Sequence, residues 1–428
     1  MRSRFNFRSE FLRSVVVVAS GAVLAQLINF ALAPIITRLY TPEELGEFNF
    51  FLRIITFISI LATARYELSL PLPGNDRDSF HLYRLALRIA SYTTLVVILF
   101  AFGFILFKHF DQDAIYLGIS VIIGSFLLVF NNLGTNWSIR VKAFNTISYS
   151  KVTAALSTNG LRVIMGVFSP GTYALIFTYL IGIALSSIQF LRVFVENNKR
   201  LQPISKKRMM VLSRIYSEFP KVSLPHAIME AGRDVIVAMF VMELFSKFVF
   251  GSYDHSMRML RLPLLLIGAS LSQVLFNRVS ELRNTGQPML PIVRKTLIYL
   301  FFFSIIPFGI VLIFGDSLFA LVFGEDWRFS GYLSQIMAPW LMFNFLASPV
   351  SAIPIVLGKQ RQFFIIGLVS SIFYLIGFGA LPLIFPDWVQ LPDSIFGFVS
   401  FTQSLITLYS IYFVVKIVRE SDADLELK

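Results

Sequence analysis

Six arginines lie inside stretches of sequence that are otherwise apolar. They are Arg53, Arg65, Arg162, Arg233, Arg258 and Arg261. A charged side chain at the centre of a bilayer costs about 2.5–3.5 kcal/mol on insertion scales, so six that face lipid would cost on the order of 15–20 kcal/mol. A guanidinium group binds phosphate through paired N–H donors in a planar fork. These arginines therefore predict a hydrated, cationic interior that accepts an anionic ligand.

The alternative for Arg233 is an ion pair with a buried acid on the same predicted helix. Glu230 lies three residues before Arg233, and Asp234 lies four residues after Glu230. Acids inside membrane helices also serve as proton or cation relays. Glu230 and Asp234 are therefore candidates both for structural pairing and for coupling transport to an ion gradient.

Two other arginines also have an acidic residue nearby in the sequence that could form an ion pair with them. Asp254 lies four residues before Arg258, and Glu67 lies two residues after Arg65. Residues four apart share one face of a helix, so an Asp254–Arg258 pair is sterically simple. Ligand binding and internal pairing both stay open for these arginines and for Arg162.

The first apolar run also contains polar residues at membrane depth. Gln26, Asn29 and Pro34 all lie within it. A proline and polar side chains suit a helix that bends and lines a cavity. Hydrogen bonds between neighbouring helices would explain the same residues equally well.

A short repeat places two of the arginines at matching positions. GEFNFFLR begins at Gly46 and GSYDHSMR begins at Gly251, and both read Gly-x-aromatic-Asn/Asp-x-x-x-Arg. Seven residues at 1.5 Å each put Arg53 and Arg258 about 10 Å along their helices from the repeat glycine. Arg261 shares a helix face with Arg258. Chance is a fair competitor for so short a match, but its position favours a duplicated fold with a site between the halves.

Composition defines the elements that must hold these residues. Of the 428 residues, 56% are hydrophobic and only 14% are charged, which is too few polar residues for the surface of a soluble protein. Apolar runs of about 20 residues predict an all-α polytopic membrane protein, since they lack the alternation of a β-barrel. Twelve helices are predicted, at residues 15–37, 46–65, 85–107, 114–134, 150–168, 172–194, 220–244, 250–275, 295–315, 331–353, 362–385 and 394–416.

The basic residues predict the orientation of these helices. If the N-terminus is cytoplasmic, 27 of the 37 lysines and arginines fall in cytoplasmic segments and four fall in outer loops. We therefore expect an inner-membrane protein with both termini in the cytoplasm. The longest segment between helices is basic, and it predicts an N-terminal lobe at 1–195, a cytoplasmic connector at 196–219 and a C-terminal lobe at 220–428. The alternative is an interfacial amphipathic helix with no organising role, and the two interpretations are compatible.

Several function classes find no support in the sequence. There is no cysteine, which excludes disulfides, thiolate metal sites and cysteine nucleophiles. Neither G-x-x-x-x-G-K-[ST] nor H-E-x-x-H occurs, and the four histidines are scattered. We expect no cofactor, no metal and no catalytic residue. The formal charge of +12 is better explained by cytoplasmic loops than by nucleic acid.

Longer stretches of the sequence resemble one family. The most specific are LAPIITRLYTPEELGEFNFF and ATARYELSLPLP, both between Ser20 and Pro73. GSYDHSMRMLRLPLLLIGASLSQVLF and FGEDWRFSGYLSQIMAPW follow later. In these stretches the chain resembles the bacterial polysaccharide flippases, the Wzx-type translocases of O-antigen and capsule. The resemblance covers nearly the whole chain and is strongest in the first two helices.

The resemblance implies a fold, a substrate and partners. The fold would be that of the multidrug/oligosaccharidyl-lipid/polysaccharide exporters, with two pseudo-symmetric six-helix lobes around a central cavity. The substrate would be a polyprenyl pyrophosphate that carries a short oligosaccharide, in contact with membrane lipids. A polysaccharide polymerase and a chain-length regulator are the partners that it suggests. The charged cavity of such proteins maps onto Arg53, Arg258 and Arg261.

The sequence thus predicts a non-enzymatic flippase that works by alternating access. The residues expected to contact substrate are Arg53, Arg65, Arg162, Arg233, Arg258, Arg261, Gln26 and Asn29. Two alternatives remain. An ion-coupled drug exporter of the same superfamily should have an acidic or apolar cavity, and a membrane-bound polysaccharide polymerase should carry a larger outer loop.

Overall fold

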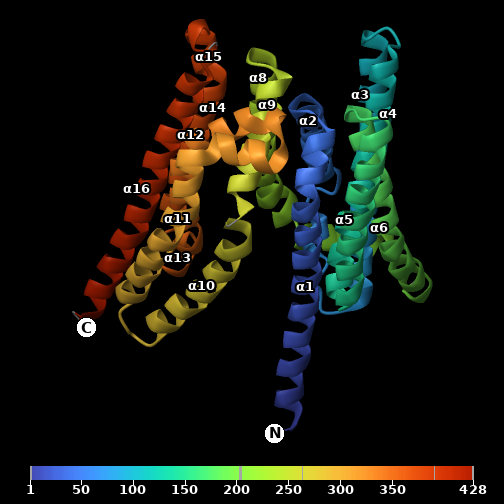
Figure 1. Cartoon of the computed structure of the whole chain (residues 1–428). Helices are drawn as coiled ribbons and strands as arrows, with labels where there is room; N and C mark the ends of the chain where they lie inside the picture. Colours follow the sequence, from blue (N-terminus) through green and yellow to red (C-terminus); the bar gives the residue numbers. More distant parts are fainter. Residues whose placement is uncertain (1, 202–204, 263, 390, 427–428) are drawn as a thin grey trace. The chain divides into compact units, whose positions relative to one another are not determined.

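The computed structural model describes residues 2–201, 205–262, 264–389 and 391–426, and within these ranges the chain has helices and no β-strand (Figure 1). Twelve long helical segments follow one another in the described residues, and each corresponds to one of the predicted helices. The predicted all-α polytopic fold is therefore confirmed.

The first half of the chain is built mainly from single helices. They are α1 (Arg2–Leu39), α2 (Pro42–Ala62), α3 (Asp76–Phe107), α4 (Gln112–Arg140), α5 (Phe144–Phe168) and α6 (Thr172–Arg200). A 3₁₀ turn, η1 (Tyr66–Ser69), follows α2. The short helix α7 (Lys206–Ile215) occupies the predicted connector, of which residues 202–204 lie outside the described part of the chain.

The second half is more interrupted. Its helical segments are η2 (Phe219–Ser223) with α8 (Leu224–Leu244); α9 (Lys247–Leu260) with η3 (Leu264–Gly268) and α10 (Ala269–Asn284); α11 (Leu290–Phe323); η4 (Glu325–Trp327) with α12 (Arg328–Val350) and α13 (Ile353–Val356); α14 (Gln360–Leu375) with η5 (Ile376–Ala380) and α15 (Leu381–Ile384); and η6 (Pro386–Val389) with α16 (Pro392–Glu426).

Three of these interruptions are π-helical turns, η2, η3 and η5. Pro220 lies in η2, where its ring removes one backbone donor. In η5, a Cβ atom on Gly379 would lie 2.7 Å from the ring of Phe240 in α8. The missing side chain therefore lets this segment pack closely against α8.

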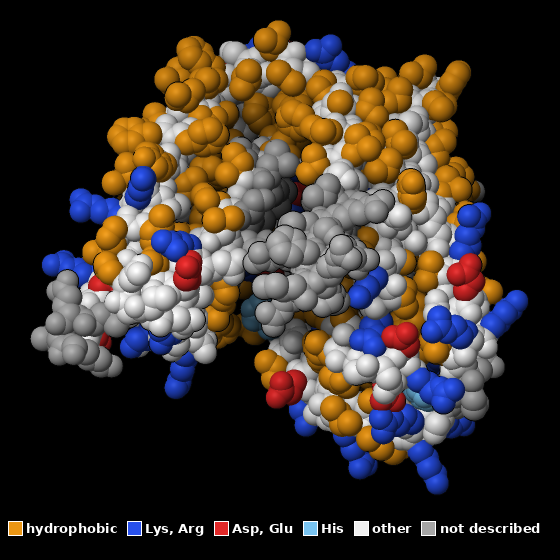
Figure 2. Space-filling view, turned by 90° about the horizontal axis from the view of Figure 1, so that it is seen from below, with side chains coloured by type: hydrophobic (Ala, Val, Ile, Leu, Met, Phe, Trp, Pro, Cys, Tyr) orange, Lys and Arg blue, Asp and Glu red, His pale blue; other side chains and the backbone are white. Residues whose placement is uncertain are grey.

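Nine of the described helices are long and apolar enough to cross a membrane. Within the described residues, α5, α8 and the pair α9–α10 do not combine the length, the hydropathy and the low number of charged residues that such a span needs. These three segments carry Arg162, Arg233, Arg258 and Arg261. Figure 2 shows apolar side chains over much of the visible surface, with Lys and Arg side chains mostly toward its margin and lower end.

The chain divides into two compact units, Met1–Ile236 and Val237–Lys428. The division falls inside α8, so the predicted lobe boundaries at 195 and 220 stay a prediction. The order of helix packing repeats in the two units. In the first, α4 packs against α2, α3 and α6, and α6 packs against α5; in the second, α12 packs against α9, α11 and α16, and α16 packs against α14.

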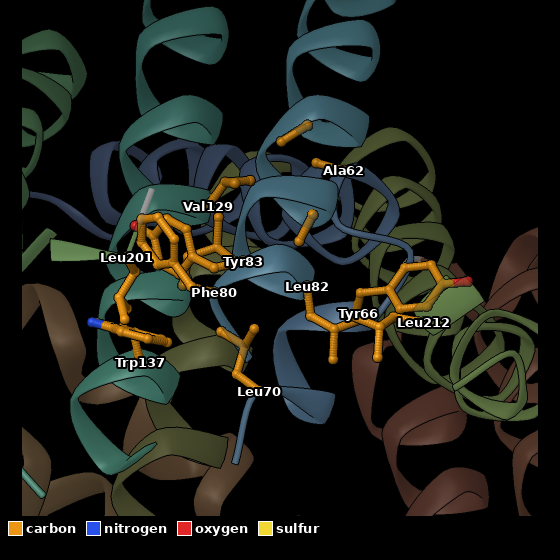
Figure 3. Packing of buried hydrophobic residues seen from close by; sticks show 13 residues of the cluster. Ala62, Tyr66, Leu70, Phe80, Leu82, Tyr83, Val129, Trp137, Leu201 and Leu212 are labelled. Carbon is orange, nitrogen blue, oxygen red and sulfur yellow. The ribbon is translucent and has the colours of Figure 1, made fainter. Parts of the chain in front are cut away.

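A buried aromatic cluster fixes α7 to the first unit (Figure 3). Phe80 packs edge-on against Trp137 at 5.3 Å between ring centroids. Leu212 of α7 is buried in the same cluster as Tyr66, whose hydroxyl donates to the carbonyl of Ser213 at 3.0 Å. Within the predicted connector, Lys206–Ile215 therefore forms an amphipathic helix that packs on the first unit.

The C-terminal helix closes the core of the second unit at one end of α11. Asp422 of α16 is buried, and its carboxylate accepts hydrogen bonds from the backbone N–H groups of Met289 at 2.9 Å and Leu290 at 2.7 Å. First-turn N–H groups have no partner within their own helix, so this carboxylate satisfies them from a distant part of the chain.

Candidate functional site

The two copies of the repeat begin with the same kind of helix cap. The side chain of Thr41 accepts a hydrogen bond from the N–H of Glu44 at 3.3 Å, and the side chain of Ser246 accepts one from the N–H of Val249 at 3.1 Å. In the first copy, the carboxylate of Glu44 accepts a hydrogen bond from the N–H of Thr41, which completes a capping box. Each helix is thus started at the same distance from its repeat glycine.

The arginines of the repeat consequently have the same register. Gly46 and Gly251 each stand four residues after the first residue of their helix, α2 and α9. Arg53 and Arg258 each follow seven residues later. The equal depth that the sequence predicts for these two arginines along their helices is what the structure shows.

In the first unit, the structure brings Arg53, Arg233 and Asp234 together. Nη1 of Arg53 donates to the backbone carbonyl of Asp234 at 3.3 Å, and Nη2 of Arg233 donates to the Asp234 carboxylate at 3.0 Å. The internal ion pair considered for Arg233 is therefore present, with its sequence neighbour as the partner. Glu230 lies one turn earlier on α8 and is exposed.

In the second unit, Arg258 and Arg261 lie at the C-terminal end of α9. Nη2 of Arg258 donates to Asp254 at 3.2 Å; the Arg258 side chain is 46% exposed and the Asp254 side chain is 12% exposed. Arg261 is exposed one turn further along. The end of α9 thus presents two arginines, of which Arg258 pairs with Asp254.

The structure corrects the position of Arg65. The prediction placed it inside the second helix, but α2 ends at Ala62. Ala64 and Arg65 both have positive φ angles, of 47° and 63°, and this left-handed turn redirects the chain into η1. Arg65 pairs with Glu67 at 3.4 Å, as its alternative interpretation proposed.

Glu67 is buried beneath this turn. The hydroxyl of Thr63 donates a hydrogen bond to its carboxylate. Burial raises the pKa of Glu67, and this effect outweighs the lowering by the Thr63 hydrogen bond and the Arg65 charge. The turn at the end of α2 thus holds a carboxylate whose charge is disfavoured.

Arg162 is stabilised by an aromatic ring. Its guanidinium carbon lies 4.5 Å from the centroid of Phe48, and its backbone carbonyl accepts a hydrogen bond from the hydroxyl of Tyr40 at 2.9 Å. Such a cation–π contact helps to stabilise the charge of the guanidinium group. Sequence reasoning missed Phe48, although it is the aromatic residue of the first repeat copy.

The polar residues of the first helix have different surroundings. Oδ1 of Asn29 accepts a hydrogen bond from Nδ2 of Asn159 at 2.6 Å, which joins α1 to α5. For Asn29, the helix–helix hydrogen bond considered from the sequence is therefore present. Gln26 is half-buried on α1, and Pro34 lies within the helix, which continues to Leu39.

The described residues contain no group of three or more histidine, aspartate or glutamate side chains that could hold a metal ion. The two units do carry arginines: Arg53 and Arg233 lie with Asp234 on α2 and α8, and Arg258 and Arg261 lie at the end of α9. These groups suit anions, which guanidinium binds in a planar fork.

The architecture is shared with solved membrane transporters. The chain matches the inward-facing conformation of a multidrug resistance MATE family transporter of the MOP superfamily, with a TM-score of 0.67 and 12% identity over 96% of this chain and 99% of that one. It matches the lipid II flippase MurJ in an inward closed conformation, with a TM-score of 0.66 and 13% identity over 96% and 91%. A MATE in complex with MaD3S has a TM-score of 0.58 at 13% identity, over 97% of each chain. The chain therefore shares its fold with these solved transporters.

The family follows from the sequence itself. A family model described as polysaccharide biosynthesis protein matches residues 35–331, which is well over half of the chain. The chain belongs to this family of polysaccharide biosynthesis proteins, and the resemblance to polysaccharide flippases is confirmed. No curated protein matches it in sequence.

Proposed function

We propose that the chain is a flippase that moves polyprenyl-pyrophosphate-linked oligosaccharide units across the bacterial inner membrane, for O-antigen, capsule or exopolysaccharide synthesis. It would catalyse no reaction and would work by alternating access. Two findings support this proposal: the family belongs to polysaccharide biosynthesis, and the fold is shared with a protein named as a lipid II flippase.

The observation that carries the proposal is the cationic group of Arg258 and Arg261 on α9. Within the described residues, α9 and α10 are each too short to count as a membrane-spanning helix on their own. Arg261 is exposed, and Arg258, which pairs with Asp254, is 46% exposed. A pyrophosphate offers the charge and the oxygen geometry that two guanidinium groups recognise.

The first unit would supply further contacts and support. Arg53 and Arg233 would meet the substrate from α2 and α8. Arg65, Arg162 and Asn29 would hold α2, α5 and α1 in place through the contacts described above. Gln26 is half-buried on α1 and stays a candidate for a sugar contact.

Glu230 and Asp234 are the proposed sites for ion coupling. Glu230 is exposed one turn before Asp234 on α8. Replacing Glu230 by glutamine should lower transport without lowering the amount of inserted protein. Unchanged transport in this variant would remove the coupling role.

A drug exporter with the same fold has less support. An arginine-rich group repels organic cations, and the family belongs to polysaccharide biosynthesis. A polysaccharide polymerase would lengthen the glycan rather than move it. The proposed partners, a polymerase and a chain-length regulator, would act on the product of this step.

The test is translocation of a fluorescent lipid-linked oligosaccharide in proteoliposomes. We expect transport by the wild type and a loss of about tenfold or more when Arg258 and Arg261 are both replaced by glutamine, since charge-assisted hydrogen bonds to phosphate disappear. Arg278→Gln is the matched control, because Arg278 forms an exposed pair with Glu281 on the next helix. Glycan lengthening, or wild-type transport in the double variant, would overturn the proposal.

A further inference from the structure

A groove runs along the second unit between α14 and α16, which pack against each other. Its volume is about 670 Å³. The lining residues Ile365, Val369, Leu405, Tyr409 and Tyr412 are apolar or aromatic, and all are exposed. The groove thus offers an apolar channel on the surface of two membrane-spanning helices.

One end of the groove is charged. Lys359 lies immediately before α14, and Lys416 lies on α16, where it contacts Glu420 at 3.8 Å. Two lysines against one carboxylate give this end a net positive charge. Long lysine side chains place their ammonium groups at the membrane interface while their methylene groups follow the apolar surface.

The length of the groove matches one leaflet of a bilayer. From Leu405 to Lys416 the axis of α16 rises about 16 Å at 1.5 Å per residue. The hydrocarbon core of a bilayer is about 30 Å thick, so a single leaflet is about 15 Å. An acyl chain that lies along the groove would therefore reach from its apolar end to the lysines.

We propose that this groove binds an anionic phospholipid of the surrounding bilayer. One acyl chain would lie between α14 and α16, and the headgroup phosphate would meet Lys359 and Lys416. Basic pockets between membrane helices are known to hold anionic headgroups. A polyprenyl chain is longer than one leaflet, so the groove fits a phospholipid better than the proposed cargo. This site does not depend on the proposed transport function.

The headgroup is tested by native mass spectrometry of the purified chain with phosphatidylglycerol or phosphatidylcholine. We expect a preference for phosphatidylglycerol that falls about tenfold or more when Lys359 and Lys416 are replaced by glutamine. Arg361→Gln is the matched control, because Arg361 lies two residues from Lys359 outside the groove lining. Equal binding of both lipids, unaffected by the lysine variants, would overturn the charge recognition.

The apolar part is tested with tryptophan. Leu405→Trp would fill the groove, whereas Leu408 is similarly exposed, 40% against 51%, but lies outside the lining. Phosphatidylglycerol binding should fall in Leu405→Trp and stay unchanged in Leu408→Trp, with equal melting temperatures showing that both variants fold. Two outcomes would overturn the proposal: displacement of phosphatidylglycerol by equimolar polyprenyl phosphate, and a dimer of the chain that Leu405→Trp abolishes.

Discussion

Arg53 reaches from α2 to α8, where its Nη1 donates a hydrogen bond to the backbone carbonyl oxygen of Asp234 at 3.3 Å. The acceptor is the backbone, so this bond does not require the Asp234 side chain. The carboxylate of Asp234 is engaged separately by Arg233. Asp234 thus contacts two arginines: its backbone carbonyl accepts from Arg53, and its carboxylate pairs with Arg233.

This arrangement predicts that Asp234→Asn is milder than Arg53→Gln. The asparagine variant keeps the bond between α2 and α8 and weakens only a solvent-screened ion pair, at a cost of about 0–1 kcal/mol. Arg53→Gln removes the bond to a partly buried carbonyl, at a cost of about 1–2 kcal/mol. Unfolding of the purified variants in detergent measures both, and equal losses would contradict the separate roles.

Asp422→Ala should destabilise the second unit by about 1–2 kcal/mol, because it removes the partner of two first-turn N–H groups of α11. Asp422→Asn retains an acceptor oxygen and should lose less. Asp424 is exposed two residues further on, and Asp424→Ala provides the control. Chemical unfolding measures the free energy of unfolding of each variant. Equal losses in Asp422→Ala and Asp424→Ala would contradict the capping role of Asp422.

The raised pKa of Glu67 predicts a pH dependence of stability. Because folding favours the protonated carboxyl, the folded state binds more protons than the unfolded state above the ordinary value near 4.5. The contribution of Glu67 is therefore present below this value and is lost as pH rises through the raised pKa. Glu67→Gln should flatten this loss in unfolding experiments, and the exposed Glu196 supplies the matched Glu196→Gln variant. If the free energy of unfolding depends on pH in the same way for Glu67→Gln and the wild type, the contribution assigned to Glu67 is refuted.

The predicted orientation can be read from α11 alone, since the chain contains no cysteine. Asn284 and Asp326 are exposed on either side of this helix. We expect a membrane-impermeant maleimide to label Asp326→Cys but not Asn284→Cys in spheroplasts. The reverse pattern would place the termini outside.

The helices were predictable because a bilayer imposes apolar runs of about 20 residues on any helix that crosses it. The start of α2 was predicted at residue 46 although Thr41-Pro-Glu-Glu44 carries the sequence signature of a capping box. The turn at Ala64 and Arg65 has no such signature, because residues other than glycine adopt left-handed conformations only when their surroundings enforce them.

The sequence predicted which residue types form the candidate site better than it predicted which side chains contact each other. Helix spacing correctly suggested Asp254 for Arg258, four residues apart. It placed both Glu230 and Asp234 near Arg233 without choosing the adjacent residue that the side chain folds back to meet. The contact of Arg162 with Phe48 joins α5 to α2, and no local pattern reports contacts at such a separation.

The bond from Leu290 to Asp422 spans 132 residues of the chain. At a synthesis rate of about 5–20 residues per second, the first turn of α11 waits about 7–26 s for the carboxylate that completes it. During that interval, the N–H groups at the start of α11 hydrogen-bond to water or lipid headgroups instead. Synthesis of α16 therefore supplies the partner of these N–H groups, and the start of α11 is satisfied only once α16 packs against it.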